Sequence, residues 1–497
     1  MNTDHESTIA SKGNEKRSKN ANKPTKKSID PKLLTPEYIL EQRRLRELRK
    51  EQIRKEKEAL GLLPPPEKDL FLKRPLLEVS KPKPGFPSIK IMSYNLLAQT
   101  LIRREIYPTN GKILKWYIRS NILLDEMKYY DADIMCLQEV DKVQYNSFWS
   151  GQFENLGFGS KFYRYNTKNH GCVIVYRKTK FECKNQSFIK LDQDLNQTDE
   201  EQKLPEARIA TNNIGFMAYL HFQPDFVKQF PSLEDANGII IGTTHLFWHP
   251  FGTYERTRQM FMLLYKFKEF KHTLDIILDN KKKFYSFFTG DFNSEPFDAP
   301  YRAITTKPIK FSGRSRTVLG CSLSYTYSKD RSLDDEEEEA QLDEEELEHE
   351  RDNNPDDPEP DVYVPTSEQE QLMDGLEDAH NDLDVRAISL YSAGYKLAHL
   401  ENSKNPGHRN EPAFSNWVDK WNGMLDYIFL LVPWNKVDDY SDKIDSPEEL
   451  AATYNVNLVK LLRLPTPAEM GPPPSGQPRL HQYPSDHLCI MAEVQLV

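Results

Sequence analysis

Short apolar runs alternate with helix-like stretches over most of the chain, from about residue 88 to the C-terminus. Runs rich in β-branched and aromatic residues and bounded by polar residues are typical of strands. They predict strands at 89–94, 133–137, 171–177, 214–222, 238–245, 284–289, 426–431 and 488–496. Apolar side chains at helical spacing predict helices over 112–130 and 255–278. This alternation favours an α/β (α+β) fold of two packed mixed or antiparallel sheets flanked by helices.

The N-terminal part lacks this alternation. Residues 1–34 are rich in Lys, Ser and Asn and poor in apolar side chains, so we expect a disordered basic tail. The segment Thr35-Pro36-Glu37 suits a helix start and predicts a charged helix over 35–61. This helix is either a solvated element docked loosely on the core or an arm for RNA binding or nuclear import. Residues 62–87 are Pro-rich and predict a linker.

A strongly acidic block interrupts the alternating region. Residues 334–361 carry 17 acidic side chains and one Arg, and such a block repels itself and cannot bury an interface. We therefore expect residues 88–497 to form one catalytic domain, interrupted at 328–384 by a disordered acidic insertion. The alternative is a functional tract, which holds basic partners such as ribosomal proteins or pre-ribosomal particles, or which competes with RNA for a basic groove.

The formal net charge of −10 does not by itself indicate a substrate. Residues 1–60 carry 16 Lys and Arg against 10 Asp and Glu, so this basic segment and the acidic block account for the imbalance. A nucleic-acid enzyme needs a basic surface. Here that surface comes from the N-terminal segment or from a local patch that the totals do not reveal.

Cysteine usage and hydropathy limit the class of protein. The five cysteines are an odd number and include no CxxC pair, which argues against a disulfide framework and a zinc site. No apolar run approaches the roughly 18 to 20 residues that span a bilayer, and the N-terminus lacks the apolar stretch of a secretory signal. We expect a monomer that stays in the cytoplasm or the nucleus and binds no membrane.

Four short polar segments stand at the ends of predicted strands. Residues 93–96, 137–139 and 290–294 each end an apolar run, and residues 485–487 precede the last one. Their side chains would meet at one edge of a sheet core. Carboxylate and carboxamide oxygens are ligands that Mg²⁺ selects, and a His exchanges protons near neutral pH. Together the segments predict a metal-dependent phosphodiesterase site, with Mg²⁺ as cofactor and Mn²⁺ as a substitute.

The acidic and amide residues of these segments divide the expected roles. Glu139 is the first metal ligand, and Asn95 supplies a neutral oxygen or contacts the phosphate. Asp291 and Asn293 lie two apart, so both point to one side of an extended segment. Asp291 would orient the attacking water or hold a second Mg²⁺, and Asp486 is a further metal ligand. Asn293 would hydrogen-bond the phosphate; its alternative is an Asx turn that closes the strand.

Two histidines are candidates for proton chemistry. His487 follows Asp486 directly, and neighbours in a strand face opposite ways, so we expect a different carboxylate to orient the His487 ring. His245 closes the apolar run GIIIGTTH and would donate to a phosphate oxygen in the transition state. The alternative for His245 is a turn residue at a strand end.

The order of these motifs resembles that of the endonuclease/exonuclease/phosphatase superfamily. Within it the chain resembles the deadenylase-like RNA exonucleases, the nocturnin, Angel and yeast NGL group. The matching segments, from about Ile89 to the C-terminus, are SYNLL, LQEV, THLFWHP, GDFNSEP, LDYIF and PSDH. The resemblance implies a DNase I-like four-layer sandwich with the site at one end of the paired sheets. The basic arm, the acidic insertion and the lack of leucine-rich repeats make the chain most similar to the yeast NGL proteins.

The resemblance also implies roles for residues outside these polar segments. Asp426, in LDYIF, is implied to be the carboxylate that fixes the tautomer of His487. Trp248 and Pro250 are implied to shape the pocket and pack on a base, and Trp421 to stack on the nucleobase. The alternative for both tryptophans is a place in the core.

Three more polar residues are candidates for substrate binding. Arg256 is a candidate phosphate clamp, with a surface helix Arg as the alternative. Arg208 and Asn213 lie in a segment that is similar to the family. Nocturnin-type enzymes carry a Lys two residues after the equivalent of His245, where this chain has Phe247. That difference argues against a 2′-phosphatase acting on nucleotides.

Taken together, the motifs predict a Mg²⁺-dependent 3′-to-5′ RNA exonuclease that acts on single-stranded RNA 3′ ends and releases 5′-mononucleotides. Similarity to the NGL proteins implies 3′-end trimming, including that of 5.8S ribosomal RNA precursors. The alternatives are a poly(A) deadenylase acting on mRNA, a phosphatase acting on a nucleotide or an inositol phosphate, and a non-catalytic scaffold bound to ribosomes or RNA.

Overall fold

The computed structural model describes residues 70–497 apart from several gaps, and six positions nearer the N-terminus. The gaps are 105, 109, 167, 193–204, 280–281, 328–353 and 472–475, and the six positions are 41, 44, 45, 48, 49 and 52. The chain divides into two compact units, Met1–Lys68 and Asp69–Val497. The described positions of the first unit are helical and fall inside the helix predicted over 35–61. The tail predicted at 1–34 lies outside the described residues.

Two mixed sheets form the centre of the larger unit. The seven-stranded sheet has the order β1 (Leu76–Glu78), β14 (Val456–Leu462), β15 (Ile490–Leu496), β2 (Ser88–Asn95), β3 (Ile134–Asp141), β5 (His170–Arg177) and β4 (Phe158–Tyr163). The six-stranded sheet has the order β10 (Val385–Ser389), β13 (Asp426–Pro433), β9 (Lys283–Asp291), β8 (Ala236–His245), β7 (Ile214–Phe222) and β6 (Phe181–Lys190). Among these strands the pairs β2–β3 and β8–β9 are parallel, and the other pairs are antiparallel. A separate hairpin joins β11 (Asn416–Val418) to β12 (Trp421–Gly423).

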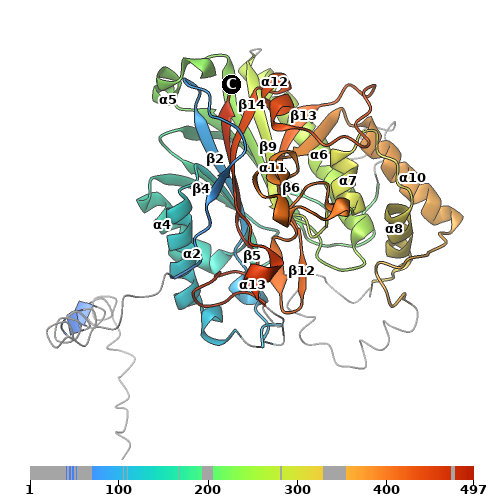
Figure 1. Ribbon diagram of the computed structural model, residues 1–497, viewed down its shortest axis with the longest axis horizontal. Coiled ribbons are helices and arrows are strands. Elements are labelled where there is room, and N and C mark those ends of the chain that lie inside the picture. Colours follow the sequence, from blue (N-terminus) through green and yellow to red (C-terminus); the bar gives the residue numbers. More distant parts are fainter. Residues whose placement is uncertain are drawn as a thin grey trace, which may run out of the picture. The chain divides into compact units, whose positions relative to one another are not determined.

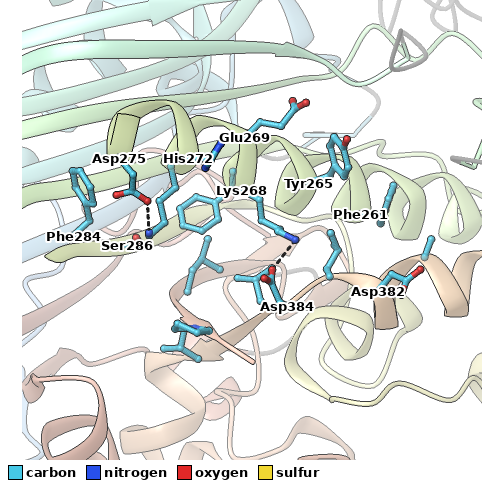
Figure 2. Close-up of a pocket in the computed structure, with 18 of the residues that line it drawn as sticks. Phe261, Tyr265, Lys268, Glu269, His272, Asp275, Phe284, Ser286, Asp382 and Asp384 are labelled. Carbon is cyan, nitrogen blue, oxygen red and sulfur yellow. Dashed lines mark hydrogen bonds and ion pairs between the residues drawn. The ribbon is translucent and has the colours of Figure 1, made fainter. Parts of the chain in front are cut away.

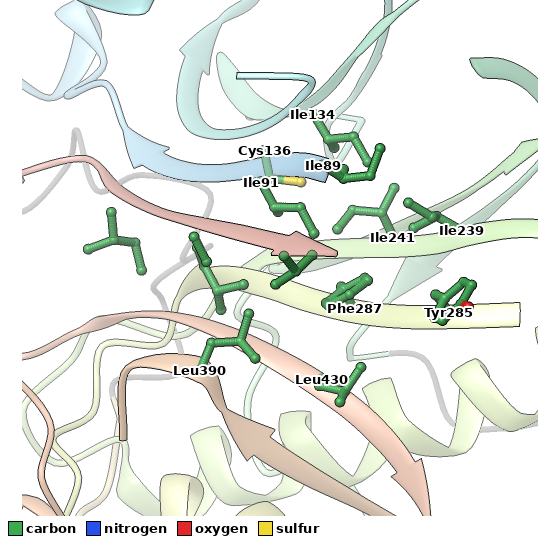
Figure 3. Packing of buried hydrophobic residues seen from close by; sticks show 14 of the residues in the cluster. Ile89, Ile91, Ile134, Cys136, Ile239, Ile241, Tyr285, Phe287, Leu390 and Leu430 are labelled. Carbon is green, nitrogen blue, oxygen red and sulfur yellow. The ribbon is translucent and has the colours of Figure 1, made fainter. Parts of the chain in front are cut away.

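The two sheets pack face to face around one apolar core (Figure 3). Ile89 and Ile91 of β2 point into this core together with Ile239 and Ile241 of β8 and Phe287 of β9, and all five are fully buried. Successive side chains of a strand point to opposite faces. Each such side chain contributes about 1.5–3 kcal/mol by leaving water. The shared core therefore fixes the position of one sheet against the other.

Helices cover the outer faces of the paired sheets (Figure 1). The seven-stranded sheet carries α2 (Trp116–Tyr130) and α4 (Ser150–Asn155), and the six-stranded sheet carries α6 (Thr253–Leu278), α7 (Ala299–Thr305), α8 (Arg314–Ser324) and α10 (Ser367–Asp382). Further short helices are η2 (Gln99–Leu101), η3 (Gly111–Leu114), α3 (Lys142–Gln144), η4 (Tyr145–Trp149), α5 (Pro224–Gln229), η5 (Pro231–Leu233), α11 (Leu390–Ala398), η7 (Leu400–Asn402), η8 (Pro406–His408), α12 (Pro447–Thr453) and α13 (Pro467–Met470). This is the predicted four-layer α+β sandwich. Within the described part of the chain, no helix has the length and apolar character of a membrane span.

The Pro-rich linker predicted at 62–87 is wrong for its C-terminal part. β1 lies inside this range and pairs with β14. Arg74 is buried, its Nη2 lies 3.7 Å from Glu126 Oε1, and it donates to the Cys489 carbonyl at 2.9 Å. A buried charge persists only when it is paired and hydrogen-bonded. The segment is therefore part of the domain.

The disordered insertion predicted at 328–384 is wrong for its second half, and residues 328–353 lie outside the described residues. α10 begins at a capping box formed by Thr366 and Gln369. Its Met373 and Leu376 are buried against the outer face of the six-stranded sheet. Three-residue spacing of two apolar side chains is a weak signal within an acidic sequence, which is why composition indicated disorder there.

Candidate active site

Polar side chains lie at the ends of neighbouring strands, at one edge of each sheet. In the six-stranded sheet, His245 ends β8 opposite Asp291, which ends β9. Asp426 begins the antiparallel neighbour β13, also opposite Asp291. In the seven-stranded sheet, Asn95 ends β2, which is parallel to β3 and its Glu139. Parallel strands that end together, beside an antiparallel strand that begins there, bring these side chains to one edge.

Glu139, His245 and Asp291 form the first cluster, with one ligand atom of each within 4.8 Å of the others. His245 Nε2 lies 3.7 Å from Asp291 Oδ2 and 4.0 Å from Glu139 Oε1. Asn95 Nδ2 donates to Glu139 Oε1 at 2.7 Å and to Asp291 Oδ2 at 2.9 Å. Two carboxylates held this close repel each other unless a cation or a proton lies between them. The cluster is therefore suited to a positively charged ligand.

Two residues of the site have left-handed backbone conformations, Glu139 at φ 52° and Asn293 at φ 44°. Glu139 lies where the β3–β5 register is irregular, between Leu137 and Val140, and Ala98 N–H donates to its Oε2 at 2.9 Å. A left-handed backbone costs a residue with a side chain about 1–2 kcal/mol. The surrounding hydrogen bonds hold this conformation, which aims the Glu139 carboxylate out of the strand.

The loop after β9 contains an Asx turn whose Asx residue is Asp291, and not Asn293, for which the sequence offered a turn as the alternative. Asn293 N–H donates to Asp291 Oδ1 at 3.0 Å, and Asn293 Nδ2 donates to the Leu246 carbonyl at 2.9 Å. An amide carries two N–H donors. Asn293 contributes only its backbone N–H to the turn, and its side-chain contact with phosphate stays a prediction.

Asp291, Asp426 and His487 form the second cluster, which shares Asp291 with the first. His487 Nδ1 lies 2.8 Å from Asp426 Oδ2, and His487 Nε2 lies 3.4 Å from Asp291 Oδ2. Ser415 Oγ donates to the same Asp426 oxygen at 2.7 Å. Asp426, and not its sequence neighbour Asp486, therefore orients the His487 ring, as the family resemblance implies.

The His487–Asp426 pair favours a positive charge on the His487 ring. Burial opposes ionisation of His487, but the Asp426 and Asp291 carboxylates outweigh burial and raise the pKa of His487 well above its usual value. Burial raises the pKa of Asp426, and the charge of His487 acts in the opposite direction. The two carboxylates thus favour the protonated form of His487, whose Nε2 lies towards Asp291.

The donor set of the first cluster fits a hard divalent cation. Glu139 and Asp291 offer carboxylate oxygens, which are the ligands that Mg²⁺ and similar ions select. Asn95 faces these carboxylates with its amide nitrogen, because its Oδ1 accepts Leu97 N–H at 2.9 Å. The Asn95 amide group donates to both carboxylates and so holds them beside each other; neither the metal-ligand role nor the phosphate contact expected for it is seen in this arrangement.

Residues 92–487 match the model of the Endonuclease/Exonuclease/phosphatase family. The chain belongs to this family. The matched range runs from β2 to His487 and includes every residue of both clusters.

Two fungal relatives cover nearly the whole chain. RNA exonuclease NGL2 of Saccharomyces cerevisiae is 40% identical over 93% of this chain and 89% of its own length. A Schizosaccharomyces pombe protein named "Probable RNA exonuclease C9B6.11c" is 33% identical over 94% of this chain and 89% of its own length. A crystal structure of ANGEL2, described as a 2′,3′-cyclic phosphatase, matches this chain with 19% sequence identity and a TM-score of 0.50. The match covers 86% of this chain and 98% of the ANGEL2 chain. At that identity ANGEL2 supports the family fold alone.

Asp486 lies outside both clusters, and the structure contradicts its predicted role as a metal ligand. Its Oδ2 accepts the Tyr107 hydroxyl at 2.7 Å, and its Oδ1 accepts the Ser485 hydroxyl at 3.2 Å. The strand alternation that turns His487 towards Asp426 turns Asp486 the other way. Asp486 thus secures the loop before β15.

Arg256 is not placed as a phosphate clamp. It is buried, and its Nη1 donates to the carbonyls of Phe247 at 3.1 Å and His249 at 2.7 Å. Asn213 acts in a similar way, because its Nδ2 donates to the His245 carbonyl at 2.8 Å. Arg256 therefore holds the THLFWHP loop in place, and Asn213 holds the backbone of His245.

Arg208 also forms its hydrogen bonds with groups outside the two clusters. Its guanidinium donates to three carbonyls at the end of α8, those of Ser322, Leu323 and Tyr325. A guanidinium whose donors are used by backbone carbonyls has little left for substrate. The structure therefore does not support the predicted substrate contact of Arg208.

The three residues implied to contact a base differ in exposure. Trp421 is 52% exposed, so the core alternative does not hold for it. Trp248 is half-buried against the ring of His249, and Pro250 is exposed. β12, which carries Trp421, pairs with β11, and Asn416 of β11 bridges to His487. The hairpin that carries Trp421 therefore contacts the second cluster through Asn416, and Trp421 itself pairs with Val418.

Sequence reasoning missed three residues that support the site. Ser415 holds Asp426, and Arg119 donates to the carbonyls of the loop after Asn95. Gln138 Nε2 donates to Thr243 Oγ1 at 2.9 Å and so joins the two sheets. Gln138 lies within the LQEV motif and could have been found there, whereas Ser415 and Arg119 lie in segments without a motif.

A cavity of about 1240 Å³ lies elsewhere, between α6, α10 and the far ends of β9 and β13 (Figure 2). Ion pairs at its rim join Lys268 to Asp384 at 2.7 Å and Lys271 to Asp275 at 2.9 Å. It opens at the start of β9 and the end of β13, whereas the site lies at the end of β9 and the start of β13. This cavity therefore lies at the opposite edge of the sheet from the active site.

Proposed function

We propose that this chain is a Mg²⁺-dependent 3′-to-5′ RNA exonuclease that releases nucleoside 5′-monophosphates. The observation that carries the proposal is the pair of polar clusters that share Asp291, one with Glu139 and the other with the His487–Asp426 pair. The name of the 40% identical relative, which covers 93% of this chain, supports RNA as the substrate. The direction and the product are taken from the resemblance of the motifs to the deadenylase-like exonucleases.

Each cluster residue has a place in such a hydrolysis. The ring N–H groups of His245 and His487 donate to oxygens of the scissile phosphate, where negative charge grows in the transition state. Asp291 accepts a hydrogen bond from the attacking water, whose oxygen bonds to phosphorus as the bond from phosphorus to the 3′ oxygen breaks. Glu139 and Asp291 would hold Mg²⁺, which neutralises charge on the phosphate when bound. Asp426 keeps the His487 ring in one orientation throughout.

The direct test uses single-stranded RNA with a 5′ label and a free 3′ end. In Mg²⁺ the purified protein should shorten this RNA stepwise and release 5′-mononucleotides. An RNA blocked by a 3′-phosphate should resist. Glu139→Gln should lose at least about 10²-fold in rate, because it removes a ligand charge. Glu493→Gln, in the same sheet and paired with Lys460, is the matched control and should keep full activity.

Two results would contradict the proposal. Shortening that is equal in wild type and Glu139→Gln would show that the clusters do not catalyse it. Release of inorganic phosphate with intact RNA would favour the phosphatase alternative.

We also propose that the natural substrates include 3′-extended ribosomal RNA precursors. Names of fungal relatives as RNA exonucleases support RNA in general, and similarity to the NGL group suggests the precursors. Sequencing of RNA 3′ ends in cells without this protein should reveal extended 5.8S ribosomal RNA. Longer poly(A) tails with normal ribosomal RNA ends would favour a deadenylase instead.

A further inference from the structure

Trp421 and Glu295 converge beside the active site from different segments. Trp421 begins β12, and Glu295 follows Asp291 by four residues in the loop after β9. A Cβ added at Gly423 would lie 2.8 Å from Trp421 Cη2 and 3.0 Å from Glu295 Oε1. The indole edge and the carboxyl oxygen therefore meet above one glycine, where a residue with a side chain would push them apart.

This pair of side chains lies close to the chemistry. Gly423 is the register partner of Asn416, and Asn416 bridges to His487. Asn416 lies between Gly423 and His487. Since neighbouring strands lie roughly 4.8 Å apart, the backbones of Gly423 and His487 are about 10 Å apart. Trp421 is 52% exposed. An aromatic face and a carboxyl group thus stand within reach of the nucleotide whose phosphate contacts His487.

The Glu295 carboxyl is oriented and partly desolvated. Burial raises the pKa of Glu295 to about 7, with further contributions from the Asp298 and Glu359 carboxylates, whereas the Arg314 guanidinium and the Met424 N–H that it accepts act in the opposite direction. Both forms of a carboxyl group accept a hydrogen bond from an amino group, whereas the ionised form repels a carbonyl oxygen. The nearby Arg314 already pairs with Glu359. Glu295 is therefore an acceptor placed next to an exposed indole.

We propose that Glu295 selects the base of the terminal nucleotide while that base stacks on Trp421. Adenine, cytosine and guanine each carry an exocyclic amino group that can donate to Glu295. Uracil carries carbonyl oxygens on both sides of its N3–H and is disfavoured. This inference rests on the proposed function, because it assumes that a nucleotide is bound at the Asp291 and His487 clusters.

The test measures binding of AMP, CMP, GMP and UMP to the whole protein in Mg²⁺ by titration calorimetry. UMP should bind at least about fivefold more weakly than the other three, the lower end of what one base contact discriminates. Glu295→Ala should bring all four affinities within about twofold of one another. Glu295→Gln replaces one carboxyl oxygen by an NH2 group that can donate to a uracil carbonyl, so it should bring UMP closer to the other three ligands.

Matched variants separate base selection from general effects. Trp421→Leu should weaken all four nucleotides by fivefold or more, because stacking is worth roughly 1–3 kcal/mol per base. Glu359→Gln changes a neighbouring carboxylate and should leave the order of affinities unchanged. Glu295→Ser serves in place of Glu295→Ala if the latter melts at a lower temperature than wild type.

A second measurement distinguishes failure of this inference from failure of the proposed function. Removal rates are compared for RNAs that differ only in a 3′-terminal A, C, G or U. If no RNA is shortened but weak UMP binding depends on Glu295, the exonuclease proposal fails and base selection stands. Equal binding of UMP by wild type, or discrimination that survives Glu295→Ala and Glu295→Ser, would overturn the inference whether or not RNA is degraded.

Discussion

Asp291 is the residue on which both halves of the site depend. Its Oδ2 accepts from Asn95 and lies near His245 and His487, and its Oδ1 closes the Asx turn of its own loop. It is almost fully buried. Glu139, by contrast, belongs to the first cluster alone. Changes at Glu139 therefore test metal binding without removing the His487–Asp426 pair.

Mg²⁺ should stabilise the wild-type protein and not Glu139→Ala. An ion that binds only the folded state adds about 2.7 kcal/mol at a concentration 100 times its Kd. Thermal unfolding in EDTA and in a Mg²⁺ series measures this effect without any substrate. Glu493→Ala, on the same sheet, should respond like wild type. An identical rise in Tm for Glu139→Ala would place the ion elsewhere.

Ser415→Ala should lower kcat by about 10- to 100-fold and leave KM close to its original value. The Ser415 hydroxyl donates to Asp426 Oδ2 and accepts the N–H groups of Leu425 and Asp426. Loss of a group that orients a catalytic side chain typically has an effect of this size. Ser415→Thr keeps the hydroxyl and should recover part of the rate. Ser147→Ala, at an exposed serine, is the control. A change in KM with kcat unchanged for Ser415→Ala would contradict a positioning role for Ser415.

At the scale of elements, the segment before β2 belongs to the domain more firmly than its composition indicates. β1 adds a strand at the edge of the seven-stranded sheet, and Arg74 beside it pairs with Glu126 of α2. The cation also lies over the rings of Tyr130 and Tyr483. One buried side chain thus ties the N-terminal strand to a helix and to the last loop.

Arg74→Ala should reduce the free energy of unfolding by about 3–5 kcal/mol, because it leaves the Glu126 carboxylate buried without its partner. Deletion of residues 1–68, the separate unit, should leave this free energy nearly unchanged. Urea unfolding of both variants makes the comparison. The exposed neighbouring Lys73→Ala should cost less than about 1 kcal/mol. A deletion as damaging as Arg74→Ala would contradict the domain boundary.

At the scale of the whole molecule, the sandwich buries a carboxyl group that belongs to neither cluster. Glu411 is fully buried, and its Oε1 accepts the Tyr301 hydroxyl at 2.9 Å. Burial raises the pKa of Glu411 to about 7. The unfolded chain keeps the ordinary value near 4.3. Between pH 7 and about 4.3, Glu411 is therefore protonated in the folded protein and ionised in the unfolded chain. The free energy of unfolding accordingly increases as the pH falls through 7.

Glu411→Gln should flatten the pH dependence of stability. In wild type this group contributes roughly 1 kcal/mol per pH unit as the pH falls from about 7 towards 5, and above pH 7 the contribution is lost. The amide of the variant does not titrate. Urea unfolding of both proteins at pH 8, 7, 6 and 5 measures the difference. The exposed Glu401→Gln should follow wild type; a variant curve parallel to wild type would refute the assignment.

The hydrophobic pattern predicted the interior strands and not the edges. All eight predicted strands exist, and each lies between two neighbours in its sheet. The edge strands β1, β4, β6 and β10 of the two large sheets were missed, as were the interior strand β14 and the hairpin strands β11 and β12. An edge strand pairs on one side only and tolerates charged and polar side chains, as in the FECKNQSFIK sequence of β6. The continuous apolar runs that identify a strand arise from burial on both faces.

The sequence by itself determined which polar residues end strands, because strand ends and side-chain alternation are local properties. Glu139, His245, Asp291 and His487 were predicted at the site on that ground, and the structure brings them together. The partners of buried polar groups were decided only by the tertiary structure. Arg256 binds backbone carbonyls where a phosphate clamp was expected, since hydrogen-bond partners come from segments that meet only when the two sheets pack.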